Sequence, residues 1–134
     1  MTEPALSNVP DDLVYTKEHE YVARTGDSAI VRIGITDYAQ GELGDVVFVN
    51  LPKVGDTVEG HQSFGTIEAV KAVSELYAPV AGEVVEVNAK LESDPAAVNR
   101  DPYGEGWMIA IRTKSGADLD ALLSAADYRS HIGE

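Results

Sequence analysis

The chain has 134 residues, and its 10 basic and 23 acidic residues give a formal net charge of −13. This length, with a hydrophobic content of 44%, predicts one globular domain with a buried core. The negative charge argues against a polyanionic partner, so no nucleic acid binding is expected. Because the sequence holds no cysteine, disulfides, thiolate metal sites and thiol redox chemistry of its own are excluded.

The first residues differ in character from the rest. Residues 1–12 contain two prolines and three acidic residues, with no basic residue and no long apolar run. We expect a flexible leader at 1–12 and a single domain at 13–134. The leader lacks the features of a secretory or transit peptide, and no stretch reaches the length of a membrane span. The sequence therefore predicts a cytoplasmic protein without a membrane partner.

Short apolar runs separated by turn residues predict a mainly β protein. The first two strands are expected at 20–24 and 29–35, on either side of a Gly-Asp turn. A short helix is expected at 36–40, because Thr36 can cap it and glycines follow. Further along the chain we expect strands at 45–50, 82–88 and 107–113, a helical turn at 95–99, and a helical segment over 118–132.

One internal similarity is visible. Residues 55–59 and 82–86 both follow the pattern glycine, acid, any residue, valine, glutamate. The match is either chance in a chain rich in valine and glutamate or a sign of two similar halves of a sandwich.

The segment 66–78 has two interpretations. Ile67, Val70 and Val73 are spaced three apart, which is typical of an amphipathic helix. The alternative is a β-hairpin with Lys71 at its tip. No glycine or asparagine stands where a tight turn would need one, so local rules favour the helix.

The residues that flank this segment favour the hairpin instead of the helix. Lys71 lies 16 residues after Gly55 and 11 before Gly82. A Gly-Asp turn, a central lysine and a Pro-x-x-Gly-x-Val strand at this spacing resemble the lipoyl/biotinyl carrier family. The resemblance implies a flattened β-sandwich (the lipoyl/biotinyl hammerhead) of two similar halves, with short helices and a C-terminal helical segment. It places the lysine at a hairpin tip, so we predict the hairpin.

The residues around Lys71 indicate which members of this carrier family the sequence resembles. Biotin carriers have methionine on both sides of the lysine, whereas Lys71 lies between Val70 and Ala72, which resembles a lipoylation site. Further segments are similar to the H-protein family of the glycine cleavage system, from residue 13 to about residue 128. They are residues 17–22, 34–40, 43–49, 67–72, 84–88 and 99–107.

This resemblance implies a carrier rather than an enzyme. Lipoate would be joined by an amide to Lys71 by a lipoylating enzyme. The carrier would take the aminomethyl group of glycine from glycine decarboxylase to an aminomethyltransferase, and then reducing equivalents to dihydrolipoyl dehydrogenase. A tether suits this cycle because it raises the effective concentration of the cargo at each partner.

Three acidic residues are candidates for holding the charged cargo. By the resemblance, Glu18, Glu20 and Glu75 would dock the arm in a surface cleft, where carboxylates accept charge-assisted hydrogen bonds from an ammonium group. The alternative is that all three are solvated surface acids.

Two departures from the family pattern and the three histidines give weaker predictions. The chain departs from the family pattern at Tyr21, where tryptophan is usual, and a packing role is expected there. Glu42 replaces a histidine that some members have near the site. The histidines are far apart in sequence and match no metal motif, so each is predicted to be structural or solvated; they are His19, His61 and His131.

Four other functions stay open from the residues alone. They are a lipoyl domain of a 2-oxo acid dehydrogenase complex, a biotin carrier, an unmodified acidic interaction protein of the same fold, and a small hydrolytic enzyme. The last would use Glu20 and Glu75 as an acid/base pair.

Overall fold

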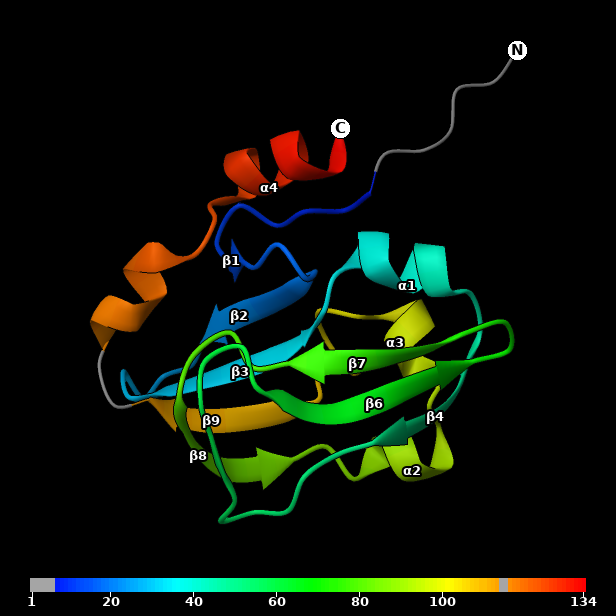
Figure 1. Ribbon diagram of the computed structural model, residues 1–134, viewed down its shortest axis with the longest axis horizontal. Coiled ribbons are helices and arrows are strands. Elements are labelled where there is room, and N and C mark those ends of the chain that lie inside the picture. The colour runs from blue at the N-terminus through cyan, green and yellow to red at the C-terminus, as the bar shows by residue number, and fades with distance from the viewer. Residues whose placement is uncertain (1–6, 114–115) are drawn as a thin grey trace.

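The computed structural model describes residues 7–113 and 116–134. The chain forms a six-stranded antiparallel sheet in the order β1-β2-β3-β9-β8-β5 and a three-stranded sheet in the order β4-β6-β7 (Figure 1). The mainly β fold is as predicted. The elements are β1 (Val14–Tyr15), β2 (Glu20–Arg24), β3 (Ile30–Ile35), α1 (Asp37–Leu43), β4 (Val46–Asn50), β5 (Thr57–Val58), β6 (Ser63–Ala69), β7 (Val73–Tyr77), β8 (Gly82–Val87), α2 (Lys90–Ser93), α3 (Ala97–Arg100), β9 (Ile109–Thr113), the 3₁₀ helix η1 (Gly116–Ala121) and α4 (Ala125–Ile132).

An aliphatic core fills the space between the two sheets. Side chains alternate between the two faces of a strand, so each sheet sends one set of apolar residues inward. Such burial stabilises the fold by about 25 cal/mol for each Å² of apolar surface removed from water. The fully buried side chains of this core include Ile33, Ile67, Leu76, Met108 and Ile111.

The segment that local rules assign to a helix is a β-hairpin, as the family resemblance predicts. β6 pairs with β7, with Ile67 opposite Ser74 and Glu68 opposite Val73. β4 pairs with the other edge of β6. β6 has a strand partner on each side and β7 pairs with β6, so strand pairing satisfies many backbone groups of this segment and overrides its helical periodicity.

The two segments that share the Gly-acid-x-Val-Glu pattern are neighbours in one sheet. β5 pairs antiparallel with β8, with Thr57 opposite Glu83 and Val58 opposite Gly82. The repeated pattern therefore marks two adjacent strands of the larger sheet.

The helical predictions need two corrections. The segment predicted over 118–132 is interrupted between η1 and α4, because Leu123 exchanges two backbone hydrogen bonds of 2.8 Å with Tyr15 of β1. Ser124 then caps α4 by accepting from the Asp127 N–H. The predicted turn at 95–99 corresponds to α3, and the helix α2 just before it was missed.

A second cluster, which we call the aromatic cluster, lies under α4. It consists of the buried residues Val9, Tyr15, Tyr21, Ala125 and Tyr128. Tyr21 has the packing role expected for it, and its hydroxyl donates to the Pro102 carbonyl at 2.6 Å.

Part of the predicted leader contacts this cluster. Val9 is buried in it, and the Asn8 N–H donates to the Asp37 carboxylate at 2.9 Å. The domain boundary at residue 13 stays a prediction. Among the described residues, no helix combines the length and the apolar character that a membrane crossing requires.

Candidate functional site

Lys71 lies in the turn between β6 and β7, at the exposed tip of the hairpin. The Ala69 N–H donates to the Ala72 carbonyl at 2.7 Å and closes the turn. The Val70 N–H donates to the Asp45 carbonyl at 3.1 Å, which fastens the turn to the loop before β4. In Figure 1 this turn projects at the right-hand edge, beyond both sheets. The backbone is held in place while the lysine amine faces solvent.

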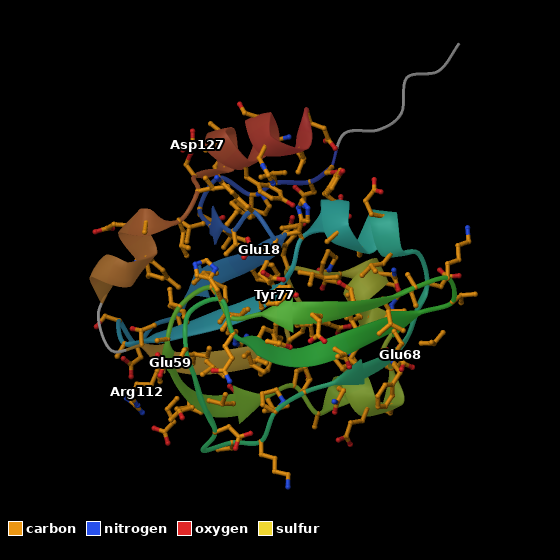
Figure 2. The ribbon with its side chains drawn as sticks, viewed as in Figure 1. Glu18, Glu59, Glu68, Tyr77, Arg112 and Asp127 are labelled. Atoms are coloured by element: carbon orange, nitrogen blue, oxygen red, sulfur yellow. The ribbon has the colours of Figure 1, made fainter. Side chains whose placement is uncertain are left out.

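A cleft of about 330 Å³ lies beside the same hairpin. β7 forms one wall, α1 a second, and the turn and strand that contain Glu18, His19 and Glu20 a third. Figure 2 labels Glu18 next to Tyr77, at the end of β7 opposite the lysine turn. The apolar part of the lining, which we call the apolar floor, consists of Ile35, Ala39, Leu43, Ile67 and Leu76.

The three predicted acidic residues all line this cleft. Glu18, Glu20 and Glu75 come together from segments more than fifty residues apart in the chain. Lys71 is not among the described residues of the lining. It stands four residues before Glu75 on the hairpin, which is about 13 Å along an extended chain.

Glu20 is the most buried of the three, with 2% of its surface exposed. Its carboxylate accepts hydrogen bonds from the Thr16 hydroxyl at 3.0 Å and from the Tyr77 N–H at 3.5 Å. Burial raises the pKa of Glu20 to about 8, against the lowering effect of these hydrogen bonds. The folded environment therefore favours the protonated form of this carboxyl group.

The other two acids are more exposed and have polar partners. One carboxylate oxygen of Glu18 lies 3.2 Å from His61 Nδ1. The Ser63 hydroxyl donates a short hydrogen bond to Glu75 from the neighbouring strand. The cleft therefore combines one buried carboxyl group with two carboxylates nearer to water.

Sequence reasoning missed several residues of the lining. His19 was predicted to be structural or solvated, and Glu42 was noted only as a departure from the family pattern, yet both line the cleft with Tyr38 and Ser74. His19 was recognisable through its position between two candidate acids. Tyr38 and Glu42 lie four residues apart on α1, so they share one helix face.

The arrangement does not assemble a metal centre from the described part of the chain. Within residues 7–113 and 116–134, no group of three or more histidine, cysteine or acidic side chains is placed to hold a metal ion. The chemistry that the site can offer is a primary amine for modification and an acidic, partly apolar cleft for a cationic group.

The two stacked sheets and the lysine at a hairpin tip define a β-sandwich of the lipoyl/biotinyl carrier type. The family model described as "Glycine cleavage H-protein" matches residues 13–134. The chain therefore belongs to the glycine cleavage H-protein family, whose members carry lipoate in the glycine cleavage system. This membership favours that system over the 2-oxo acid dehydrogenase, biotin and hydrolase alternatives.

Individual relatives agree with this assignment. The glycine cleavage system H protein of Mycolicibacterium vanbaalenii is 54% identical over 132 residues, which cover 96% of this chain and 100% of that protein. The H protein of Staphylococcus carnosus is 55% identical over 126 residues, or 94% and 98% of the two chains. A crystal structure of the H protein from Mycobacterium marinum superposes with a TM-score of 0.85 at 40% identity and covers 94% of this chain and 100% of that chain.

Proposed function

We propose that this protein is the lipoylated carrier of a glycine cleavage system, with lipoate attached through an amide to Lys71. The observation that carries the proposal is the exposed lysine on a hairpin whose second strand, β7, forms a wall of an acidic cleft. The attachment site for a covalent cofactor and one wall of the cleft that would hold the cofactor therefore belong to the same hairpin.

The residues of the cleft fit such a cofactor. An aliphatic chain suits the apolar floor, and a cationic cargo suits the carboxyl groups above it. When bound, lipoate supplies two sulfurs, one of which takes up the aminomethyl group of glycine, and the pair later carries reducing equivalents. The chain has no cysteine of its own for that work.

In this proposal the protein's own residues bind the cationic cargo and shield it from water. On docking of a cationic group, Glu20 would release its proton to bulk water and would pair with that group in a site of low dielectric constant, where the attraction is stronger than in water. Glu75 and Glu18 add negative charge, and the apolar floor excludes the water that would hydrolyse the cargo.

The partners follow from the same proposal. They are glycine decarboxylase, an aminomethyltransferase, dihydrolipoyl dehydrogenase and the lipoylating enzyme. The net charge of −13 favours rapid, electrostatically steered encounters with partners that present basic surfaces.

Intact mass and peptide mapping of the protein from lipoate-supplied cells test the proposal. We expect one lipoyl increment on Lys71 and none on Lys53, which is also exposed and lies in another loop. Glycine and the decarboxylase should then add a glycine-derived carbon to the modified protein alone. A biotin increment, or an unmodified Lys71 in cells with active lipoylation, would contradict the proposal.

A further inference from the structure

Tyr128 lies on α4 near the end of the chain, yet its hydroxyl reaches residues that build the cleft. The side chain is fully buried. Its oxygen lies 2.8 Å from His19 Nδ1 and 2.7 Å from Thr36 Oγ1. His19 belongs to the acidic wall of the cleft, and Thr36 caps α1, which forms another wall. One hydroxyl group therefore connects two walls.

Two orders of donors satisfy this connection. The Tyr128 hydroxyl donates either to His19 Nδ1, in which case the Thr36 hydroxyl donates to the Tyr128 oxygen, or to Thr36 Oγ1, in which case His19 Nδ1–H donates to the Tyr128 oxygen. In both orders Thr36 Oγ1 also accepts from the Ala39 N–H at 3.2 Å, and His19 and Tyr128 are neutral. Burial and the nearby His131 lower the pKa of His19, and burial raises the pKa of Tyr128; both effects favour these neutral forms.

The backbone around His19 depends on the same contacts. His19 has a φ of +74°, in the left-handed region that residues with a side chain rarely adopt. Its N–H donates to the Thr16 carbonyl at 3.2 Å, and its carbonyl accepts from the Thr36 N–H at 3.0 Å. Thr36 thus holds His19 twice, once through the backbone and once through Tyr128. Such a conformation persists where the surroundings determine it.

We infer that Tyr128 is a positioning residue of the cleft: its hydroxyl fastens His19 to the start of α1 and so holds Glu18 and Glu20 in place around a docked arm. Tyr128 acts through His19 and Thr36, and it is not among the described residues that line the cavity. The inference rests on the proposed function, because its consequence is a longer lifetime of the loaded arm in water.

Tyr128→Phe and Tyr15→Phe test this role as a matched pair. The rings of Tyr15 and Tyr128 stack at 4.8 Å, and both side chains are fully buried. The Tyr15 hydroxyl donates to the Pro10 carbonyl at 2.6 Å instead of to the cleft walls. Each variant therefore removes one hydroxyl group from the same cluster, and only Tyr128→Phe removes a contact with His19 and Thr36.

The measurement is the release of ammonia and formaldehyde from the lipoylated, glycine-loaded proteins in the absence of tetrahydrofolate. We expect Tyr128→Phe to shorten the lifetime of the loaded arm about fivefold, the effect of roughly one net hydrogen bond, and Tyr15→Phe to change it by less than about twofold. Nitrogen-detected NMR should show a hydrogen-bonded His19 Nδ1 in the wild type and a changed Nδ1 resonance or tautomer balance in Tyr128→Phe alone.

The possible outcomes separate the two proposals. Equal lifetimes in Tyr128→Phe and the wild type, or equal losses in both variants, would overturn the positioning role. A wild-type protein that takes up neither lipoate nor glycine-derived carbon would overturn the proposed function instead. If Tyr128→Phe does not fold, Thr36→Val removes the hydroxyl at the other end of the connection, and an unchanged lifetime in that variant would likewise overturn the inference.

Discussion

The hairpin turn and the cleft beside it meet opposite physical requirements. Lys71 is exposed, and only the backbone around it is tied down. Glu20 is 2% exposed, and two hydrogen bonds hold its carboxyl group. A group that must be modified by another enzyme needs access, whereas a group that must recognise a cation gains strength from exclusion of water. One hairpin provides both, because its turn leaves the sandwich and its second strand borders the cleft.

Replacing the lysine should give the largest effect and should leave the cleft intact. We expect Lys71→Arg to abolish lipoylation and glycine-dependent loading, since a guanidinium group cannot form the amide. The free energy of unfolding should change by less than about 0.5 kcal/mol, as is usual at exposed positions. Mass spectrometry and urea unfolding measure the two quantities. Lys53→Arg is the control, and loading that survives in Lys71→Arg would refute the role of the lysine.

Neutralising the buried acid should act on the cleft and spare the turn. Glu20→Gln keeps the shape of the side chain and removes its ability to ionise. We expect normal lipoylation but a lifetime of the loaded arm shortened about tenfold, the size of one charge-assisted hydrogen bond. Glu59→Gln, at an exposed site labelled in Figure 2, is the matched control. A lifetime in Glu20→Gln equal to that of the control would remove Glu20 from the docking site.

The same substitution should change how stability depends on pH. The Glu20 pKa rises from 4.5 to about 8 on folding, so the folded protein binds more protons than the unfolded chain between these values. The contribution of Glu20 to stability is therefore complete below pH 4.5 and is lost as the pH rises toward 8.

Unfolding of the unlipoylated proteins by urea measures this effect. Relative to the wild type, Glu20→Gln should gain stability with rising pH by at most about 1.4 kcal/mol per pH unit. Parallel stability curves for the two proteins between pH 5 and pH 8 would show that Glu20 titrates at its ordinary pKa.

The smallest effect is expected where the cleft meets solvent. His61 approaches Glu18 at 3.2 Å, but its side chain is 74% exposed. His61→Asn removes this pair and tolerates the left-handed φ of +66° at that position. We expect the free energy of unfolding to fall by less than about 0.5 kcal/mol. Thermal unfolding at low and high salt measures it, and a loss above about 1 kcal/mol would mean that Glu18 depends on His61.

Much of the fold was predictable from local patterns. The alternating apolar runs predicted β2, β3, β4, β8 and β9 to within two residues, and Thr36 marked the start of α1. The interrupted C-terminal helix was not predictable, because the break comes from pairing between Leu123 and Tyr15, which are 108 residues apart. The helix α2 is four residues long and has no side-chain cap, so it left little signal in the sequence.

The residues of the site likewise divide into those that the sequence indicated and those that it did not. Lys71 and the three candidate acids were predictable only through the family resemblance, since nothing local distinguishes them from other charged residues. The burial of Glu20 and the cleft position of Tyr38 were beyond the sequence, whereas His19 was marked only by its place between two candidate acids and Glu42 only as a departure from the family pattern. Each depends on the contact of α1 and β7 with the strand and turn around His19.

The sequence by itself determined the residue types, the strand periodicity and the spacing around Lys71, because these belong to the covalent chain. Tertiary structure decided the conformation of residues 66–78, where the pairing of β6 with β4 and β7 outweighs helical spacing. Tertiary structure also decided which carboxyl group is buried away from water. The pKa of Glu20 and the reach of Tyr128 to His19 arise from groups that approach one another only when the two sheets and α4 have packed.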